Sequence, residues 1–150
     1  MDPQAELDTM IDRFTPEVAA DARAALAMVT ARLPGATILV YDNYNALAIA
    51  FGANAKLSGV VCSVALYPRW VSLFLSNGPE LPDPHRLLAG EGATMRHIKL
   101  TPGLIADARV HALLDAAAAS VGVPIDPAVK ERLVIKSVSA KQRPRRPAGG

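Results

Sequence analysis

The sequence predicts an α+β domain, in which an antiparallel sheet of about five strands, connected as a meander, packs on N-terminal and C-terminal helices. Three observations support this class: a capped helical segment, a following series of five strand-like runs, and a second helix start after them. The chain has 150 residues, of which 51% are hydrophobic. This length and composition suit one domain with one substantial core.

The first long helix is predicted from a Thr-Pro-Glu start. Thr15 can cap the helix, Pro16 suits the first helical position, and the charge of Glu17 is favourable at the positive end of the helix dipole. A Pro-Gly pair follows, so the helix is expected to end at Arg32 or Leu33. A shorter amphipathic turn or helix is expected just before it.

The middle of the chain changes to strand-like runs separated by short, turn-rich pieces, which favours antiparallel pairing of neighbours. In the run that begins after Arg69, alternation separates an aliphatic face from a face that carries Trp70 and Phe74. That second face is the candidate binding surface of the sheet. The five runs are Thr37 to Tyr41, Ala46 to Phe51, Val60 to Tyr67, Val71 to Ser76 and Met95 to Leu100.

Two further helices are predicted after the strands. Thr101-Pro102 repeats the Thr-Pro start, and Asp126-Pro127 is a candidate start for a last helix. Residues 1–139 are expected to form the single domain. Residues 140–150 are basic and Pro-rich and contain no large apolar anchor, so they are expected to form a disordered tail.

The most distinctive segment is the Gly/Pro-rich stretch 77–92, which is too long for a hairpin loop and too apolar in its middle for a flexible linker. It is expected to be packed, either as a functional loop or as a structural Ω-loop whose leucines cover the end of the sheet. Asp83-Pro84 looks like a cap that opens one helical turn through Leu87. The positions expected to shape the loop are Gly78, Leu81, Pro84, Leu88, Gly90 and Gly92.

The strand after this segment alternates strictly, so Arg96 shares a face with Ile98 and is predicted to be partly buried, while His97 lies on the other face. A buried guanidinium needs a carboxylate. Asp83 or Glu80 is the nearest candidate, and such a pair would pin the loop to the strand.

No set of residues forms a recognisable catalytic site. The three histidines lack the spacing of a helical metal site, the glycines around Glu91 miss the dinucleotide pattern, and Cys62 lies in an apolar run, where an inert core thiol is expected. The low aromatic content argues against a cofactor stacked on rings. We therefore expect a non-catalytic protein that binds a small molecule or a protein partner, with five candidate ligand-binding residues: Trp70, Phe74, Asp83, Arg96 and His97.

Metal binding is the alternative function, and an enzyme of unknown type is a third. The N-terminal acids pair at helical spacing, Asp8 with Asp12 and Glu17 with Asp21, and could present oxygens to iron or magnesium. The same pattern is typical of a solvated helix face. The basic tail could contact nucleic-acid phosphates without sequence preference, or serve only to keep the protein soluble.

The sequence also indicates in which cellular compartment the protein is expected. No segment approaches the roughly 20 apolar residues of a membrane span, and the N-terminus lacks the pattern of a signal peptide. The single cysteine suits a reducing compartment. A cytoplasmic protein with no membrane contact is expected, and self-association into a homo-oligomer stays open.

The segments Leu81-Pro82-Asp83-Pro84, Leu87 to Gly92 and Met95-Arg96-His97-Ile98 resemble the signature of the YdhG-like family of bacterial domains of unknown function. The likeness extends over approximately Thr15 to Ala118. It implies a small α+β fold with an antiparallel sheet backed by helices. Some members are described as frataxin-like intracellular iron chaperones, so the resemblance also implies iron handling as one role. The matching positions are Gly78, Leu81, Asp83, Pro84, Leu88, Gly90, Gly92, Arg96 and His97.

Overall fold

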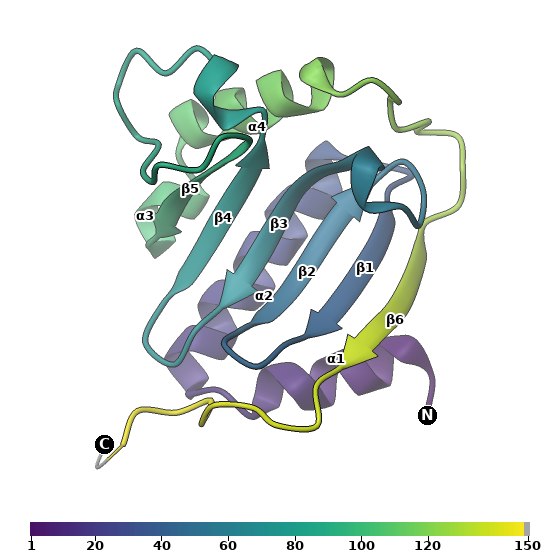
Figure 1. Ribbon diagram of the computed structural model, residues 1–150, viewed down its shortest axis with the longest axis vertical. Helices are drawn as coiled ribbons and strands as arrows, with labels where there is room; N and C mark the ends of the chain where they lie inside the picture. Colours follow the sequence, from purple (N-terminus) through teal and green to yellow (C-terminus); the bar gives the residue numbers. More distant parts are fainter. Residues whose placement is uncertain (149–150) are drawn as a thin grey trace.

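A computed structural model describes residues 1–148 as a six-stranded sheet with helices packed on one of its faces (Figure 1). The helices are α1 (Pro3–Asp12), α2 (Pro16–Arg32), α3 (Pro102–Ile105) and α4 (Ala108–Ser120), with short 3-10 turns η1 (Leu57–Gly59) and η2 (Gly78–Glu80). The strands are β1 (Thr37–Asp42), β2 (Leu47–Gly52), β3 (Val60–Leu66), β4 (Val71–Ser76), β5 (Met95–Leu100) and β6 (Arg132–Val138).

Strands β1 to β5 form the predicted meander, because each is antiparallel to the next and the strand order across the sheet is β5-β4-β3-β2-β1-β6. The α+β class and the backing helices are therefore confirmed. The sheet has six strands where about five were expected, since β6 returns from the C-terminal region and pairs in parallel with β1.

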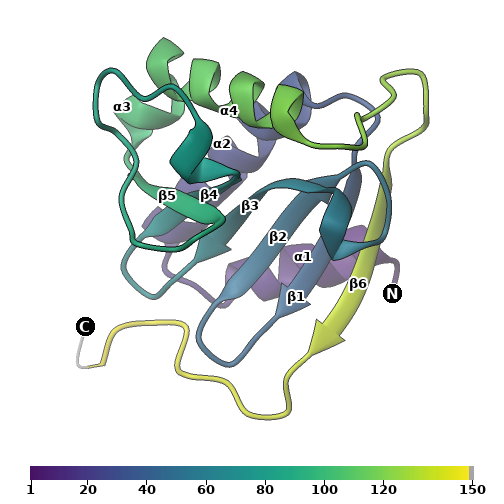
Figure 2. The same ribbon diagram turned by 45° about the horizontal axis from the view of Figure 1, so that its top comes forward.

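The core lies between the sheet and the helices α2 and α4, which contact strands β3 and β4 (Figure 2). Side-chain caps begin the helices as predicted: the Thr15 hydroxyl accepts from the Val18 N–H, and the Thr101 hydroxyl accepts from the Leu104 N–H. Asp107 caps α4, so the helical region after β5 is split in two. Within residues 1–148, no helix combines the length and apolar character needed to cross a membrane.

The helix expected to start at Asp126 is absent, and this prediction was wrong. The Asp126 carboxylate does accept a hydrogen bond from the Ala128 N–H, at 2.9 Å, but it closes only a turn. The chain then extends, and Leu133, Val134 and Ile135 pair with β1. The open edge of β1 offers backbone hydrogen bonds to this β-branched run, which outweighs the local cap.

The expectation of a disordered tail is also corrected for residues 140–148, while residues 149–150 lie outside the described chain. Arg145 is buried and donates to the Asp42 carboxylate at 2.7 Å and to the Asn43 carbonyl at 2.6 Å. The backbone N–H of Arg143 donates to the Tyr44 carbonyl. A buried acid at the end of β1 therefore anchors a segment that has no apolar anchor of its own.

Segment 77–92 is packed, as expected, but its middle differs from the prediction. The Asp83 carboxylate accepts hydrogen bonds from the backbone N–H groups of Leu87 and Leu88, both at 2.9 Å. Arg86 adopts a left-handed φ of 53°, so the chain reverses there and the expected helical turn does not form. Ala89 then exchanges two backbone hydrogen bonds with His97 and covers part of the β5 edge.

Candidate functional site

The face of the sheet opposite the helices is not covered by α1, α2, α3 or α4 (Figures 1 and 2). We call it the uncovered face. Its side chains follow from the strand registers, because residues directly opposite one another in neighbouring strands share a face. One row across this face reads Tyr41, Ala48, Ala65, Ser72 and Lys99.

The next row across the same face reads Leu39, Ala50, Ser63, Phe74 and His97. In both rows the residues of β2 and β3 are small, whereas a tyrosine or leucine stands on β1. On the other side, β4 and β5 carry Phe74 and His97 in the second row and Ser72 and Lys99 in the first. The centre of the face is therefore lower than its sides.

This difference in side-chain size produces two adjoining hollows of about 420 Å³ each, which share Asn43, Ala48, Ser63 and Met95. We call the two together the trough. The residues that define it are Tyr41, Tyr44, Ala48, Ala50, Ser63, Ala65, Tyr67, Phe74 and Met95.

Aromatic side chains concentrate around this face. The chain has one Trp, three Tyr and three Phe residues. Phe14 and Phe51 belong to the helix-backed core. The others line the trough or a third hollow that adjoins it at Tyr67 and Asn45. They are Tyr41, Tyr44, Tyr67, Trp70 and Phe74. The chain has few rings, and the fold gathers most of them on one surface.

Three of the five predicted ligand-binding residues lie on the uncovered face. Trp70 stacks on Tyr67 with ring centroids 4.8 Å apart, and the Lys99 ammonium lies 4.8 Å from the centre of the Trp70 ring. Phe74 and His97 are cross-strand partners with ring centroids 5.0 Å apart. Partial burial raises the pKa of the Tyr67 phenol, because desolvation disfavours its charged form.

The other two predicted residues, Asp83 and Arg96, do not join this surface or each other. Arg96 shares the face of Ile98 and is half-buried, as predicted, but its Nε donates to the Gly92 carbonyl at 3.0 Å. Asp83 is occupied by the backbone N–H groups of its own loop. The predicted ion pair between loop and strand was therefore wrong, because backbone groups satisfy both side chains.

Two glycines of the loop lie where a side chain would not fit. A side chain at Gly78 would collide with Arg96 of β5, including its backbone nitrogen. Gly90 has a φ of 103° and passes close to the His97 ring, where a side chain would meet Nδ1. Leu81 belongs to the core, and Leu88 packs against it, while Pro84 is exposed. Gly78 and Gly90 therefore allow the loop to pass close to β5, and Leu81 ties it to the core.

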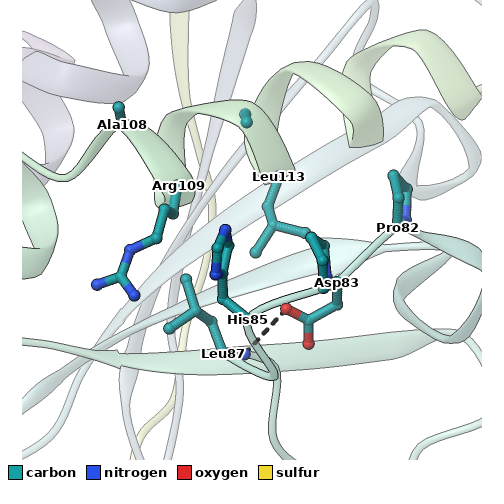
Figure 3. A pocket seen from close by; sticks show the side chains of 9 residues that line it. Pro82, Asp83, His85, Leu87, Ala108, Arg109 and Leu113 are labelled. Carbon is teal, nitrogen blue, oxygen red and sulfur yellow. Dashed lines mark hydrogen bonds between the residues drawn. The ribbon is translucent and has the colours of Figure 1, made fainter.

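Another cleft, of about 370 Å³, lies between this loop and helix α4. Figure 3 shows Asp83, His85 and Leu87 of the loop facing Arg109 and Leu113 of the helix. Its charged groups already have partners, since Asp83 binds loop N–H groups and Arg109 donates to Asp107 at 2.7 Å. That partner lowers the pKa of Asp107 to about 2. The wall of the cleft is therefore mainly apolar, and its charged side chains are already hydrogen-bonded within the protein.

The acidic candidates for a metal site are not brought together. Asp12 pairs with Arg23 at 2.8 Å, and Asp8 accepts a hydrogen bond from Gln4. Glu17 and Asp21 lie in the first turns of α2. Over the described part of the chain, residues 1–148, there is no group of three or more His, Cys, Asp or Glu side chains that could hold a metal ion.

Cys62 is fully buried on the helix side of β3, so it is expected to resist modification. Burial raises the pKa of the Cys62 thiol, because a thiolate would be desolvated in the core. A disulfide reagent such as DTNB should therefore leave folded protein unmodified at about pH 8 and react once urea unfolds it. Folding stability should decline as the pH rises above about 8.5, where only the unfolded thiol ionises. Reaction of folded protein at the rate of a free thiol would contradict this assignment.

Sequence reasoning missed most of the trough. Ala48 and Ala50 alternate with Leu47, Ile49 and Phe51, a pattern that could have placed the two alanines on the face opposite the core. The positions of Tyr41 and Ser63 follow from the same kind of alternation. No local signal could place the tail beside the turn between β3 and β4, because that contact joins distant parts of the chain.

No family model, curated protein or solved structure matches this chain. The resemblance to the YdhG-like family therefore stays a prediction.

Proposed function

We propose that this protein is a non-catalytic binding domain that holds a small ligand in the trough of its uncovered face. The concentration of rings there carries the proposal: Tyr41, Tyr44, Tyr67 and Phe74 surround a floor of small residues. Tyr44 is exposed and the other three rings are half-buried, and partly exposed rings offer a flat apolar surface to a ligand.

The size of the trough favours a small molecule over a flat protein interface. Ligand sites usually enclose roughly 300 to 1,000 Å³ and combine apolar walls with a few polar groups. The two hollows of about 420 Å³ adjoin each other along the small residues of β2 and β3. Ser63 on this floor and Asn43 in the turn between β1 and β2 supply polar groups.

The hydroxyl groups of the face favour binding over catalysis. A catalytic serine needs a neighbouring base that accepts its proton. The Ser76 hydroxyl donates instead to the Val60 carbonyl at 2.7 Å. Among the described residues, neither Ser63 nor Ser72 is hydrogen-bonded to an imidazole or a carboxylate.

A metabolite screen against the ¹⁵N-labelled protein, with its amide signals observed by NMR, tests the proposal. Compounds that bind should shift the amide signals of Ala48, Ser63 and Ala65. Ser63→Trp should fill the trough and abolish those shifts, whereas Ala112→Trp, which fills the cleft beside α4, should leave them unchanged. Hits confined to the α4 cleft, or binding that survives Ser63→Trp, would contradict the proposed site.

We also propose a cytoplasmic location. The one cysteine is a free, buried thiol, which suits a reducing compartment. Fractionation of cells that express the tagged protein tests this, and recovery from the extracellular or membrane fraction would contradict it.

A further inference from the structure

We infer that the ligand is a planar ring compound that carries an anionic group, with its ring in the trough and its anion in a basic hollow beside it. The inference rests on the proposed function and names the class of ligand. The supporting observation is a third hollow, of about 710 Å³, that adjoins the trough at Tyr67 and Asn45. We call it the basic hollow, and its residues are Asn45, Tyr67, Pro68, Arg69, Trp70, Arg143, Pro144, Arg146, Pro147 and Ala148.

The basic hollow is formed by two segments that are far apart in the sequence. The turn between β3 and β4 supplies Arg69 and Trp70, and the tail supplies Arg143 and Arg146. Figure 1 shows the tail passing beneath the ends of the strands toward this turn. The buried contact between Arg145 and Asp42 holds the tail in that path.

The charge of this hollow has one sign. Three guanidinium groups line it, and no carboxylate of residues 1–148 is among its lining residues. None of Arg69, Arg143 and Arg146 is in an ion pair with a carboxylate of the described chain. Lys99 adds a fourth cation next to Trp70. Several cations gathered around a concave site without a counter-charge attract an anion.

Two of these cations are also held in place. The Arg143 guanidinium lies 5.6 Å from the centre of the Tyr44 ring, and Arg146 donates to the Arg13 carbonyl at 3.2 Å. A held guanidinium loses less conformational freedom when it binds a carboxylate or phosphate, for which its geometry is suited.

The trough supplies the complementary half of the site. Tyr67 lines both the trough and the basic hollow, so a ring on the floor of small residues in the trough would lie next to the cations. Phe74 of β4 and Tyr44 of the turn between β1 and β2 also line this part of the trough. Stacking on such rings is insensitive to the substituents of the ligand, whereas the cations demand a negative charge. The two halves together select a ring with an attached anion over either fragment alone.

The experiment compares probes that contain one or both halves. The complete probes are naphthyl phosphate and thymidine monophosphate, and the fragments are naphthol, thymidine and inorganic phosphate. Affinities are measured by calorimetry, and the site is identified by the indole N–H signal of Trp70, the only tryptophan of the chain. At least one complete probe should bind about tenfold or more tightly than its fragments and should shift this signal. Its affinity should fall with added salt.

A pair of matched variants tests the role of the charges. Arg69→Gln with Arg143→Gln removes two exposed cations of the basic hollow and should weaken the complete probe by about tenfold or more. Lys130→Gln with Arg132→Gln removes the same charge from exposed positions before and at the start of β6 and should leave the affinity nearly unchanged. Thermal unfolding of both variants checks that the fold is kept.

The outcomes separate this inference from the proposed function. If neutral ring compounds bind in the trough as tightly as the phosphates, or if both pairs of variants act alike, the inference is overturned while the proposed function stands. If no compound shifts the trough signals, both fail. If a short oligothymidylate binds far more tightly than thymidine monophosphate, the occupant is a nucleic-acid strand, which also overturns the small-ligand inference.

Discussion

Replacing Arg145 with methionine is expected to lower the free energy of unfolding by about 3 to 5 kcal/mol, because it leaves a buried carboxylate without its cation. Only 3% of the Arg145 side chain and 2% of the Asp42 side chain are exposed, and their charged atoms are 2.7 Å apart. Arg13 is the other cation near Asp42, at 3.6 Å, and it is half exposed. It can therefore compensate only in part.

Two further variants separate the ion pair from other effects of the change, with equilibrium unfolding in urea as the measurement. Lys141→Met alters an exposed cation of the same segment and should change stability by less than about 0.5 kcal/mol. Asp42→Leu combined with Arg145→Met removes both charges and should recover much of the loss. An Arg145→Met protein as stable as the Lys141→Met protein would show that the tail is not anchored by this pair.

Gly78→Ala is expected to destabilise the protein by about 1 to 3 kcal/mol, through overpacking where the long loop leaves β4. The new methyl group would overlap Cβ, Cγ and the backbone nitrogen of Arg96. The backbone of β5 cannot swing away as a flexible side chain could, because β5 is paired with β4 along its length. The N–H of Gly78 also donates to the Thr94 carbonyl at 3.0 Å, which holds the two segments together.

Gly122→Ala is the matched control for this change. Gly122 is exposed, and a methyl group there would meet no heavy atom within 4 Å. Urea unfolding should show a change within about 0.5 kcal/mol for Gly122→Ala and a clear loss for Gly78→Ala. Equal stability of the two variants would mean that the close contact with β5 relaxes at no cost.

Much of the fold was predictable because its signals are local. The Thr-Pro caps at Thr15 and Thr101 begin helices at the expected positions, and the strands of the meander lie within a residue or so of the predicted runs. A cap depends on side-chain oxygens only three residues from their donors. A strand depends on alternation over about six residues.

The candidate site was predictable only in part. Alternation placed Phe74 and His97 on the face away from the core, and the structure confirms their position. It could not show that the tail would bring Arg143 next to the turn that carries Trp70. The aromatic content alone could not locate the rings, because composition does not tell which face of a sheet receives them.

The sequence by itself determined the class of the fold, the helix starts at Thr15 and Thr101 and the hydrophobic alternation of the strands, since each depends on neighbours along the chain. Only the tertiary structure decided that the run around Val134 is a strand, because its partner is β1, far earlier in the sequence. It likewise decided that Arg145 is buried, because Asp42 at the end of β1 offers a carboxylate that local sequence does not reveal. Long-range pairing decides such cases because a short segment can satisfy its backbone and charge in several ways, and the partner that completes the sheet or neutralises the buried charge selects among them.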